Sequence, residues 1–528
     1  MKNQALLVIC FGIFFLLTCC KNAPEVQVGC YYLSASGNDV NPGTKEKPWQ
    51  TVTKVNTLDL SPGDTLFLEG GSVFPGTIKL DSLDSGTEGK EVTIKSFGTG
   101  KATIDGGLSA GIEVNACDYF NVEDLMLTGA GRKDGNITDG VFIAGSDHLR
   151  IDRLEISGFQ HSGLHVYKCN DVQITNVHSH DNGFAGILVD GNTAYDPLNF
   201  DNEDIYIGYC LTENNPGDPT VLNNHSGSGI LASSVNRGVI EYCESFNNGW
   251  DMQWTGNGPV GIWIWDCNDF KIQYCISHDN KTNPVAKDGG GFDLDGGVSN
   301  SVIQYCLSYN NQGGGYGLFE FGAGKPWENN TLRYCISLND GSLNGGSVAI
   351  WRGSPEMTMR NCDIYNNTFY NSTQRGYSLT IENNATGFRF FSNIFVFKEA
   401  FLIPGARLVS ELFQGNCYFN LSGDRSIAGF KDLGEWAAIT SNEMLDGRMA
   451  GFYADPRLVD PSGFLPSGTV KLNKDDLMAF SLKSGSPLIG RGLDLEQLIN
   501  IDPGATDIAG TDLSTDTVFD IGALKYRK

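Results

Sequence analysis

Positively charged residues are scarce in this sequence of 528 residues. Lys and Arg number 37 against 62 Asp and Glu, which gives a formal net charge of −25 at pH 7. An acidic surface repels the phosphates of nucleic acids and of anionic lipid headgroups. We therefore expect no nucleic-acid partner. A strongly anionic polymer is also a poor ligand unless cations intervene.

Long apolar runs are absent after the first twenty residues, and no later run approaches the roughly 18 residues of a membrane span. The first run, Ala5 to Leu17, follows a single Lys and is typical of a signal peptide. The next residues, Leu17-Thr18-Cys19-Cys20, resemble the lipobox of bacterial lipoproteins. This resemblance implies a signal peptide over 1–19, a lipid anchor on Cys20 and a polar tether over 20–29.

We accordingly expect an exported protein, held by lipid on a bacterial outer membrane or cell surface. The anchor would be its only membrane contact. Two alternatives remain: Cys19 as the lipidated residue, or an ordinary cleaved signal peptide.

The sequence also lacks any Cys-x-x-Cys pair, which disfavours a zinc cluster among its 14 Cys. An exported protein would suggest disulfides, but six Cys recur in one context at intervals of 33, 32, 31, 29 and 27 residues: Cys210, Cys243, Cys275, Cys306, Cys335 and Cys362. Small buried thiols stacked in a column explain this regularity better than a chain of disulfides.

A helical period is missing too, whereas turn residues are frequent, with 66 Gly. Each repeat has an Asn/Asp pair, such as Asn247-Asn248, and then a strand that starts with Gly, such as Gly261-Ile-Trp-Ile. Units of this length suit one coil of a parallel β-helix, whose coils stack about 4.8 Å apart. We predict an all-β fold, a single solenoid over 30–400, and further coils with an irregular capping region over 401–528.

Both ends of the chain resemble secreted right-handed parallel β-helix carbohydrate-active proteins. The N-terminal match includes Tyr31-Tyr32-Leu33-Ser34 and Pro62-Gly63-Asp64-Thr65, with Thr51 to Leu58 as a capping helix; the C-terminal match includes Asp520-Ile521-Gly522. The resemblance implies a right-handed solenoid and export. It does not fix the reaction, because β-helices host lyases, hydrolases, esterases, epimerases and adhesins. Residues 402–480 remain unplaced.

Four long inserts flank the Gly-led strands: Asn192 to Glu203, Asn215 to Ser228, Gly249 to Val260 and Lys281 to Gly290. Stacked coils would place them along one side of the solenoid, as walls over the outer face of these strands. We therefore place a cleft for a polysaccharide or oligosaccharide there, on a monomer. His225, Asp251 and Lys287 lie in the inserts and are further candidates for contact with the ligand.

Aromatic rings and carboxylates share the outer face of the Gly-led strands. Trp263, Trp265, Trp351 and Arg352 are candidate sugar contacts, and Asp293, Asp295 and Glu320 are candidate catalytic carboxylates. Alternatively, the Trp rings cover an apolar flank, and the Asp side chains are surface residues or calcium ligands, with Asp288 and Asp293 as the possible calcium pair. No cofactor is required by the hydrolytic interpretation.

Asp293 and Asp295 are alternate residues of one predicted strand, about 6.5–7 Å apart. Two carboxyl groups about 6.5–9.5 Å apart suit an inverting glycoside hydrolase. This spacing favours an extracellular polysaccharide-degrading hydrolase.

The segment from Gly291-Phe292-Asp293-Leu294-Asp295 to Gly315-Tyr316-Gly317 resembles the active-site coils of family nine pectate lyases. That family has a catalytic Lys three residues after the Phe, where this chain has Asp295. The resemblance implies where the site lies. Because the chain lacks the Lys that serves as the base in that family, the resemblance does not extend to the lyase reaction. A pectate-type lyase using Lys287, and a non-catalytic surface glycan-binding lipoprotein, remain alternatives.

Overall fold

The computed structural model describes residues 29–192, 196–383, 385–464, 466 and 472–527. The predicted signal peptide, the anchor Cys20 and nearly all of the tether lie outside the described residues. Within these ranges, no helix combines the length and apolar character needed to cross a membrane.

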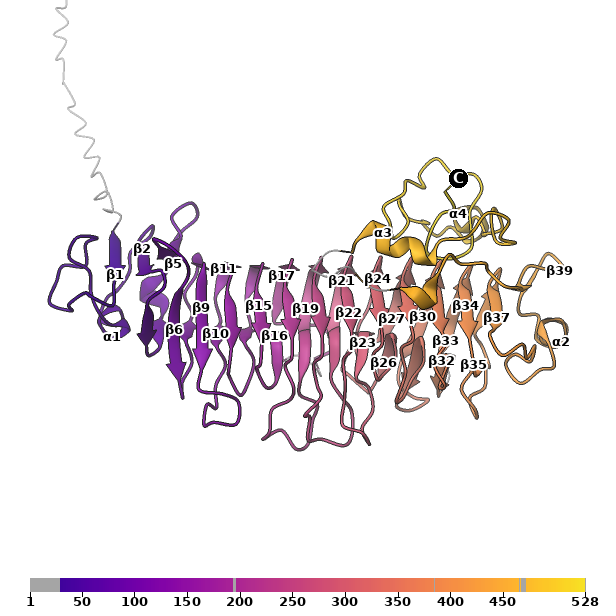
Figure 1. Cartoon of the computed structure of the whole chain (residues 1–528), viewed down its shortest axis with the longest axis horizontal. Coiled ribbons are helices and arrows are strands. Elements are labelled where there is room, and N and C mark those ends of the chain that lie inside the picture. Colours follow the sequence, from indigo (N-terminus) through magenta and orange to yellow (C-terminus); the bar gives the residue numbers. More distant parts are fainter. Residues whose placement is uncertain (1–28, 193–195, 384, 465, 467–471, 528) are drawn as a thin grey trace, which may run out of the picture.

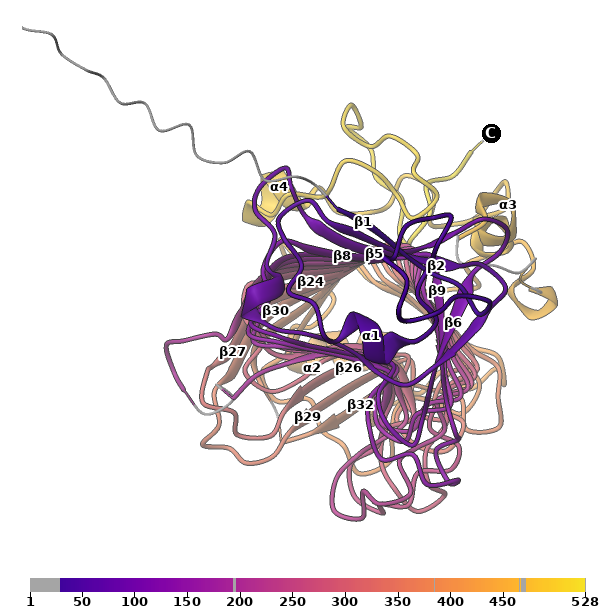
Figure 2. The ribbon, with the colours of Figure 1, turned by 90° about the vertical axis from the view of Figure 1, so that its left-hand side faces the viewer.

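The chain winds into a parallel β-helix whose three sheets run the length of the molecule (Figure 1). Each strand pairs in parallel with the corresponding strand of the next coil, as Ile262–Phe292 and Phe292–Tyr316 do. Viewed from the N-terminal end, the cross-section is triangular and α1 (Val52–Val55) lies across the core (Figure 2). The predicted solenoid and its short capping helix are confirmed.

Sheet 1 contains β1 (Cys30–Leu33), β2 (Thr65–Glu69), β5 (Val92–Phe97), β8 (Phe120–Glu123), β11 (Asp147–Asp152), β14 (Asn170–Thr175), β17 (Asn202–Gly208), β24 (Val302–Gln304), β27 (Trp327–Arg333), β30 (Met359–Tyr365), β33 (Thr386–Phe391) and β36 (Leu412–Gln414). Sheet 2 contains β4 (Ile78–Leu80), β7 (Ile112–Asn115), β10 (Val141–Ala144), β13 (Leu164–Tyr167), β16 (Ala185–Asp190), β23 (Gly290–Leu294), β26 (Tyr316–Glu320), β29 (Val348–Arg352), β32 (Tyr377–Glu382) and β35 (Ala400–Leu402). Two long strands run through both sheets, β19 (Ser228–Glu241) and β21 (Val260–Gln273).

Sheet 3 contains β3 (Val73–Pro75), β6 (Ala102–Gly107), β9 (Leu125–Gly129), β12 (Glu155–Ser157), β15 (His178–His180), β18 (Leu211–Glu213), β20 (Glu244–Phe246), β22 (Ile276–His278), β25 (Leu307–Tyr309), β28 (Ile336–Leu338), β31 (Thr368–Asn371), β34 (Ile394–Phe397), β37 (Cys417–Asn420) and β40 (Phe452–Tyr453). The ladder therefore continues past residue 400, into the region where we expect further coils.

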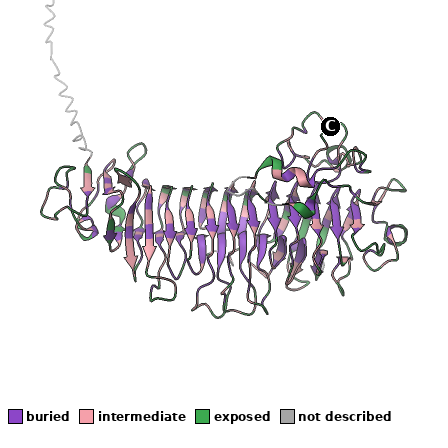
Figure 3. Ribbon diagram, viewed as in Figure 1, coloured by how far each residue is buried: buried purple, intermediate pink, exposed green. Residues whose placement is uncertain are grey.

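The core fills the inside of the triangle, and exposure concentrates in the turns and loops (Figure 3). Alternation along sheet 2 explains this: Ile262, Phe292, Tyr316 and Val348 point inward in successive coils and are fully buried. The residues between them point outward. This register decides which side chains can form a site on the outer face.

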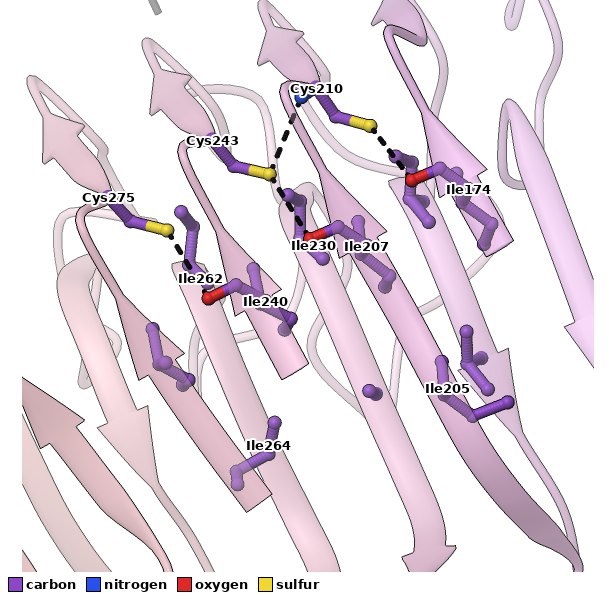
Figure 4. Close-up of a cluster of buried hydrophobic side chains, with 14 of the residues drawn as sticks. Ile174, Ile205, Ile207, Cys210, Ile230, Ile240, Cys243, Ile262, Ile264 and Cys275 are labelled. Atoms are coloured by element: carbon purple, nitrogen blue, oxygen red, sulfur yellow. Dashed lines mark hydrogen bonds between the residues drawn. The ribbon is translucent and has the colours of Figure 1, made fainter. Parts of the chain in front are cut away.

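The predicted column of buried free thiols is present at the corner between sheets 1 and 3 (Figure 4). Each Sγ points at a carbonyl of the preceding coil, as from Cys243 to the carbonyl oxygen of Ile207 at 3.8 Å. Cys362 was wrongly assigned to this column. It lies within β30, and the column continues from Cys335 to Asn367, whose Oδ1 accepts the Cys335 N–H at 2.9 Å. The error arose because Asn361, like the Tyr before each column Cys, has a left-handed backbone.

The predicted Asn column forms a buried amide ladder at the corner between sheets 3 and 2. Each Nδ2 donates to Oδ1 of the next Asn, and the ladder runs through Asn182, Asn215, Asn248, Asn280 and Asn311 to Asp340. A second ladder runs from Asn367 through Asn393 and Asn416 to Glu443. These bonds satisfy polar groups that the core would otherwise leave unpaired.

The C-terminal residues close the solenoid and cover one corner of it. α2 (Leu433–Thr440) places the fully buried Trp436 against the end of the core. The hairpin of β38 (Met444–Leu445) and β39 (Arg448–Met449) follows. The last segment, with α3 (Lys474–Leu477) and α4 (Leu495–Ile499), packs on Tyr365 of sheet 1 and Leu338 of sheet 3, away from sheet 2.

Candidate functional site

Long loops border the outer face of sheet 2 on both edges, and those that connect sheet 3 to sheet 2 hang lowest in Figure 1. Residues 214–227, 247–259 and 279–289 connect sheet 3 to sheet 2, as predicted. Residues 191–201 instead follow β16 and lead to sheet 1, so the first insert was wrongly placed on the same side. The face between the two rows of loops is the candidate site.

Three carboxyl groups gather at the middle of this face. Asp293 is the fourth of the five residues of β23 and points outward, because its neighbours Phe292 and Leu294 point into the core. Asp295 follows the strand, and its N–H donates to the carbonyl oxygen of Ile264 at 2.9 Å. Asp288 ends the preceding loop, where the N–H of Gly258 donates to its Oδ2 at 2.8 Å.

Burial raises the pKa of all three carboxyl groups, and repulsion from neighbouring carboxylates adds to this rise for Asp293 and Asp295. Burial, with the charges of Asp288 and Glu320, raises the pKa of Asp295 to about 8. Burial raises the pKa of Asp288 to about 6, against a hydrogen bond from Gly258 and the charge of Lys287. The pKa of Asp293 lies well above its ordinary value, because of burial and the charges of Asp295 and Asp288.

Few neighbouring groups offset the cost of burying the charges of this cluster. Asp293 is 2% exposed, and its Oδ1 has no hydrogen-bond partner among the described residues. None of the three forms an ion pair with a described Lys, Arg or His side chain. An unneutralised, partly desolvated acidic cluster is costly for the fold, and such groups concentrate at functional sites.

Gly317 makes room for Asp293. It lies directly opposite Asp293 in β26, and a Cβ at this position would come within 2.8 Å of the Asp293 Oδ1. A side chain on the neighbouring strand would therefore displace the carboxyl group. The glycine keeps open the space above it.

Glu320 does not fit the predicted catalytic role. It is 2% exposed, and its oxygens accept N–H groups from Gly297 at 3.0 Å, Gly322 at 2.5 Å and Ala323 at 3.1 Å. These contacts hold the loop after β26 in place. Glu320 therefore acts on the cluster through its charge, which raises the pKa of Asp295.

The two adjacent tryptophans differ in exposure. Trp263 lies opposite Asp293 in the register but is only 4% exposed, and its Nε1 donates to the Ser228 Oγ at 3.1 Å. Of the two interpretations of this ring, the cover over an apolar flank is the one that fits, because the insert with His225 lies over it and the two rings lie edge to face at 4.9 Å. Trp265 is half-buried, with its ring 5.8 Å from that of Phe321.

His225 is enclosed together with Trp263 under the insert. Burial lowers its pKa to about 4, and its Nδ1 has no partner within the described part of the chain. A neutral imidazole here adds no positive charge beside Asp293. It contributes to the apolar wall that desolvates the carboxyl group.

The remaining predicted contacts lie at the margins. Trp351 and Arg352 are half-buried on β29, two strands beyond β23, and Arg352 donates to the carbonyl oxygen of Asn383 at 3.2 Å. Asp251 forms ion pairs with Arg132 and Lys133, which hold its loop in place. Its charge is therefore already neutralised and is not directed at the cluster. Lys287 is exposed beside Asp288.

A metal centre finds no support in the described residues, where no three or more His, Cys, Asp or Glu side chains are arranged to hold an ion. Calcium at Asp288 and Asp293 stays a prediction. Sequence reasoning considered Asp288 only as a calcium ligand, although it immediately precedes Gly289-Gly290-Gly291 and lies seven residues before Asp295. That position at the end of an insert was the available signal.

Residues 31–261 match the family model described as the Pel9A-like right-handed β-helix region. Lacto-N-biosidase of Bifidobacterium longum is 25% identical over 477 residues, covering 69% of this chain and 28% of that protein. The uncharacterized protein YwoF of Bacillus subtilis is 28% identical over 148 residues, covering 26% of this chain and 31% of that protein. The chain thus spans less than a third of the length of these relatives.

Among solved structures, the native GH136 lacto-N-biosidase from Eubacterium ramulus aligns with a TM-score of 0.52 at 19% identity. The alignment covers 68% of this chain and 66% of that chain, and it supports the fold alone. Together with the family model, it confirms the expected handedness. The chain is a right-handed parallel β-helix that resembles β-helix carbohydrate-active proteins.

Proposed function

We propose that this protein is a glycoside hydrolase whose reaction takes place at Asp288, Asp293 and Asp295 on the outer face of sheet 2. The observation that carries the proposal is the unneutralised carboxyl cluster between two rows of loops. Its members titrate apart, with pKa values of about 6 for Asp288 and about 8 for Asp295. Carboxyl groups with separated pKa values can divide the acid and base roles of glycoside hydrolysis.

At neutral pH Asp295 is the protonated member with access to solvent, so we assign it as the general acid. It would transfer its proton to the oxygen of the leaving sugar as the glycosidic bond breaks. Asp288 is mostly ionised at that pH. It would either accept a proton from the water that attacks the anomeric carbon, or attack that carbon itself and form a glycosyl intermediate that water then hydrolyses. Asp293, nearly enclosed, would form a hydrogen bond with a sugar hydroxyl.

This assignment modifies the predicted Asp293–Asp295 pair by adding Asp288. The inverting outcome rested on the spacing of Asp293 and Asp295, and it now depends on which carboxyl group pairs with Asp295. The similarity to lacto-N-biosidase supports an oligosaccharide or polysaccharide as substrate. We further propose export, a lipid anchor on Cys20 at a bacterial surface, and a monomeric state.

The test is product analysis with the full chain on a panel of neutral and acidic oligosaccharides that includes lacto-N-biosides. New reducing ends, lost in Asp295→Asn and Asp288→Asn and kept in the exposed-residue control Asp134→Asn, are the expected result. Unsaturated products that absorb in the ultraviolet and persist in Asp295→Asn would replace the hydrolase with a lyase using Lys287. Binding without any product would indicate a glycan-binding protein.

A further inference from the structure

A cavity opens on the outer face of sheet 2, nearer the N-terminus than the carboxyl cluster. Its volume is about 490 Å³, and the side chains that define it come from β10, β13 and β16 and from the loops beside them: Asp139, Phe142, Ser162, His165, Leu188 and Asp190. This size lies within the range of small-ligand sites. The proposed catalytic cluster contributes no residue to it.

The register fixes where this cavity lies relative to Asp293. His165, Leu188, Leu231, Trp263 and Asp293 stand opposite one another in five successive strands of sheet 2. Four strand spacings of about 4.8 Å separate His165 from Asp293, or about 19 Å between their backbones. The intervening Leu188, Leu231 and Trp263 are 6%, 3% and 4% exposed, so covered apolar side chains divide the cavity from the carboxyl cluster.

The polar floor of the cavity is rigid. The two ring nitrogens of His165 lie 3.1 Å from the Asp139 Oδ2 and 2.8 Å from the Asp190 Oδ1. Burial alone would lower the pKa of His165, but the hydrogen bonds to Asp139 and Asp190 raise it to about 9. The Ser162 N–H donates to the Asp139 Oδ1 at 2.8 Å, which fixes this carboxylate on two sides.

One polar group in this rigid floor has its hydrogen-bonding capacity unused. Ser162 is fully buried by its neighbours and lines the cavity, and its Oγ has no partner in the part of the chain that the structure describes. A buried hydroxyl is almost always hydrogen-bonded in a folded protein. A ligand hydroxyl is the partner that this geometry can accept.

We propose that this cavity is a secondary glycan-binding site, which holds a neutral sugar residue of a long substrate about 19 Å from the catalytic cluster. The carboxylates of Asp139 and Asp190 outnumber the single positive charge of His165, so a uronate or sulfated sugar would be repelled. Sugar hydroxyls would pair with the carboxylates and with the Ser162 Oγ. The half-buried Phe142 ring presents apolar surface to the C–H face of the sugar.

This inference rests on the proposed function only for the identity of the polymer. The test measures binding to the full chain carrying Asp295→Asn, so that turnover does not interfere. The probes are an array of neutral and acidic oligosaccharides of graded length, followed by calorimetry on the best long and short binders. Phe142→Ala should weaken binding of long neutral chains about tenfold, the scale of one aromatic contact, and leave short ligands unchanged.

Ser162→Ala is the second variant, and it removes a hydroxyl that makes no bond within the described structure, so it leaves the fold intact. It should weaken the same long chains severalfold. Phe67→Ala, which removes a half-buried outer ring on sheet 1, is the matched control and should have no effect.

Unchanged affinity for long chains in both cavity variants would overturn the proposal, as would equal losses on long and short ligands. Preferential binding of acidic oligosaccharides at this cavity would overturn it as well. Failure of the catalytic proposal would be separate: Asp295→Asn would then retain activity, whatever the two cavity variants do to binding.

Discussion

Replacing Asp288 with Asn tests whether the carboxyl groups act as one titrating cluster. In the unmodified protein, kcat/KM should fall as the pH drops through about 6, because Asp288 must be ionised, and fall again above about 8, because Asp295 must be protonated. Among the neighbouring charges, that of Asp288 raises the pKa of Asp295 the most. At an effective dielectric constant of about 20, a charge about 7–10 Å away shifts a pKa by about 1–2 units.

Asp288→Asn should therefore lower kcat/KM by about 10²–10⁴-fold and move the alkaline limb of the remaining activity down by about 1–2 pH units. Carbon-13 NMR of labelled Asp gives the Asp295 pKa without relying on activity. Asp134→Asn, at an exposed position, is the control and should leave both limbs in place. An alkaline limb and an NMR-derived Asp295 pKa that both stay near 8 in Asp288→Asn would refute the reasoning.

Three further predictions test the site and the fold. Gly317→Ala should lower kcat/KM by about 10- to 100-fold, because its Cβ displaces the Asp293 carboxyl group, while Gly434→Ala in α2 should not; equal activity in both would contradict the geometry. The pKa of the Asp295 carboxyl group is raised from 3.8 to about 8, so this group destabilises the fold increasingly as the pH rises between those values. Asp295→Asn should therefore raise the Tm at pH 8 by about 2–4 °C but leave it unchanged at pH 4. An unchanged Tm at pH 8 would refute this. Asn248→Ala should cost about 2–4 kcal/mol in urea unfolding because it interrupts the amide ladder, and Cys243→Ala should cost about 1 kcal/mol; similar losses would argue against the ladder.

The repeat was predictable because the backbone imposes it on the sequence. A left-handed residue followed by an inward side chain produces the Tyr-Cys pairs from Tyr209-Cys210 to Tyr334-Cys335. The same geometry at Asn361-Cys362 misled the assignment, since one corner of the solenoid resembles another locally. Only strand pairing over distant residues distinguishes them, and β30 pairs Cys362 with Asn330.

The site was predictable as a face but only partly as a set of residues. Alternation along β23 placed Asp293 outside the core, and three of the four inserts lie along one edge of sheet 2, as their positions before the Gly-led strands indicated. The burial of Trp263 depends on the fold of the insert that carries His225, which local patterns do not encode. The cavity residues Asp139, His165 and Asp190 come from three successive coils, and their spacing in the sequence does not predict that they are in contact.

Both amide ladders end on an acidic residue, Asp340 or Glu443, which accepts the last amide and donates nothing onward. Every interior rung is equivalent, since it takes one hydrogen bond from the coil before and gives one to the coil after. A whole coil can therefore be duplicated or deleted between two rungs without leaving an amide unpaired, provided that the terminal carboxylate is kept. In evolution, such a solenoid can change its length, and with it the span of its outer face, from the middle while both ends stay the same.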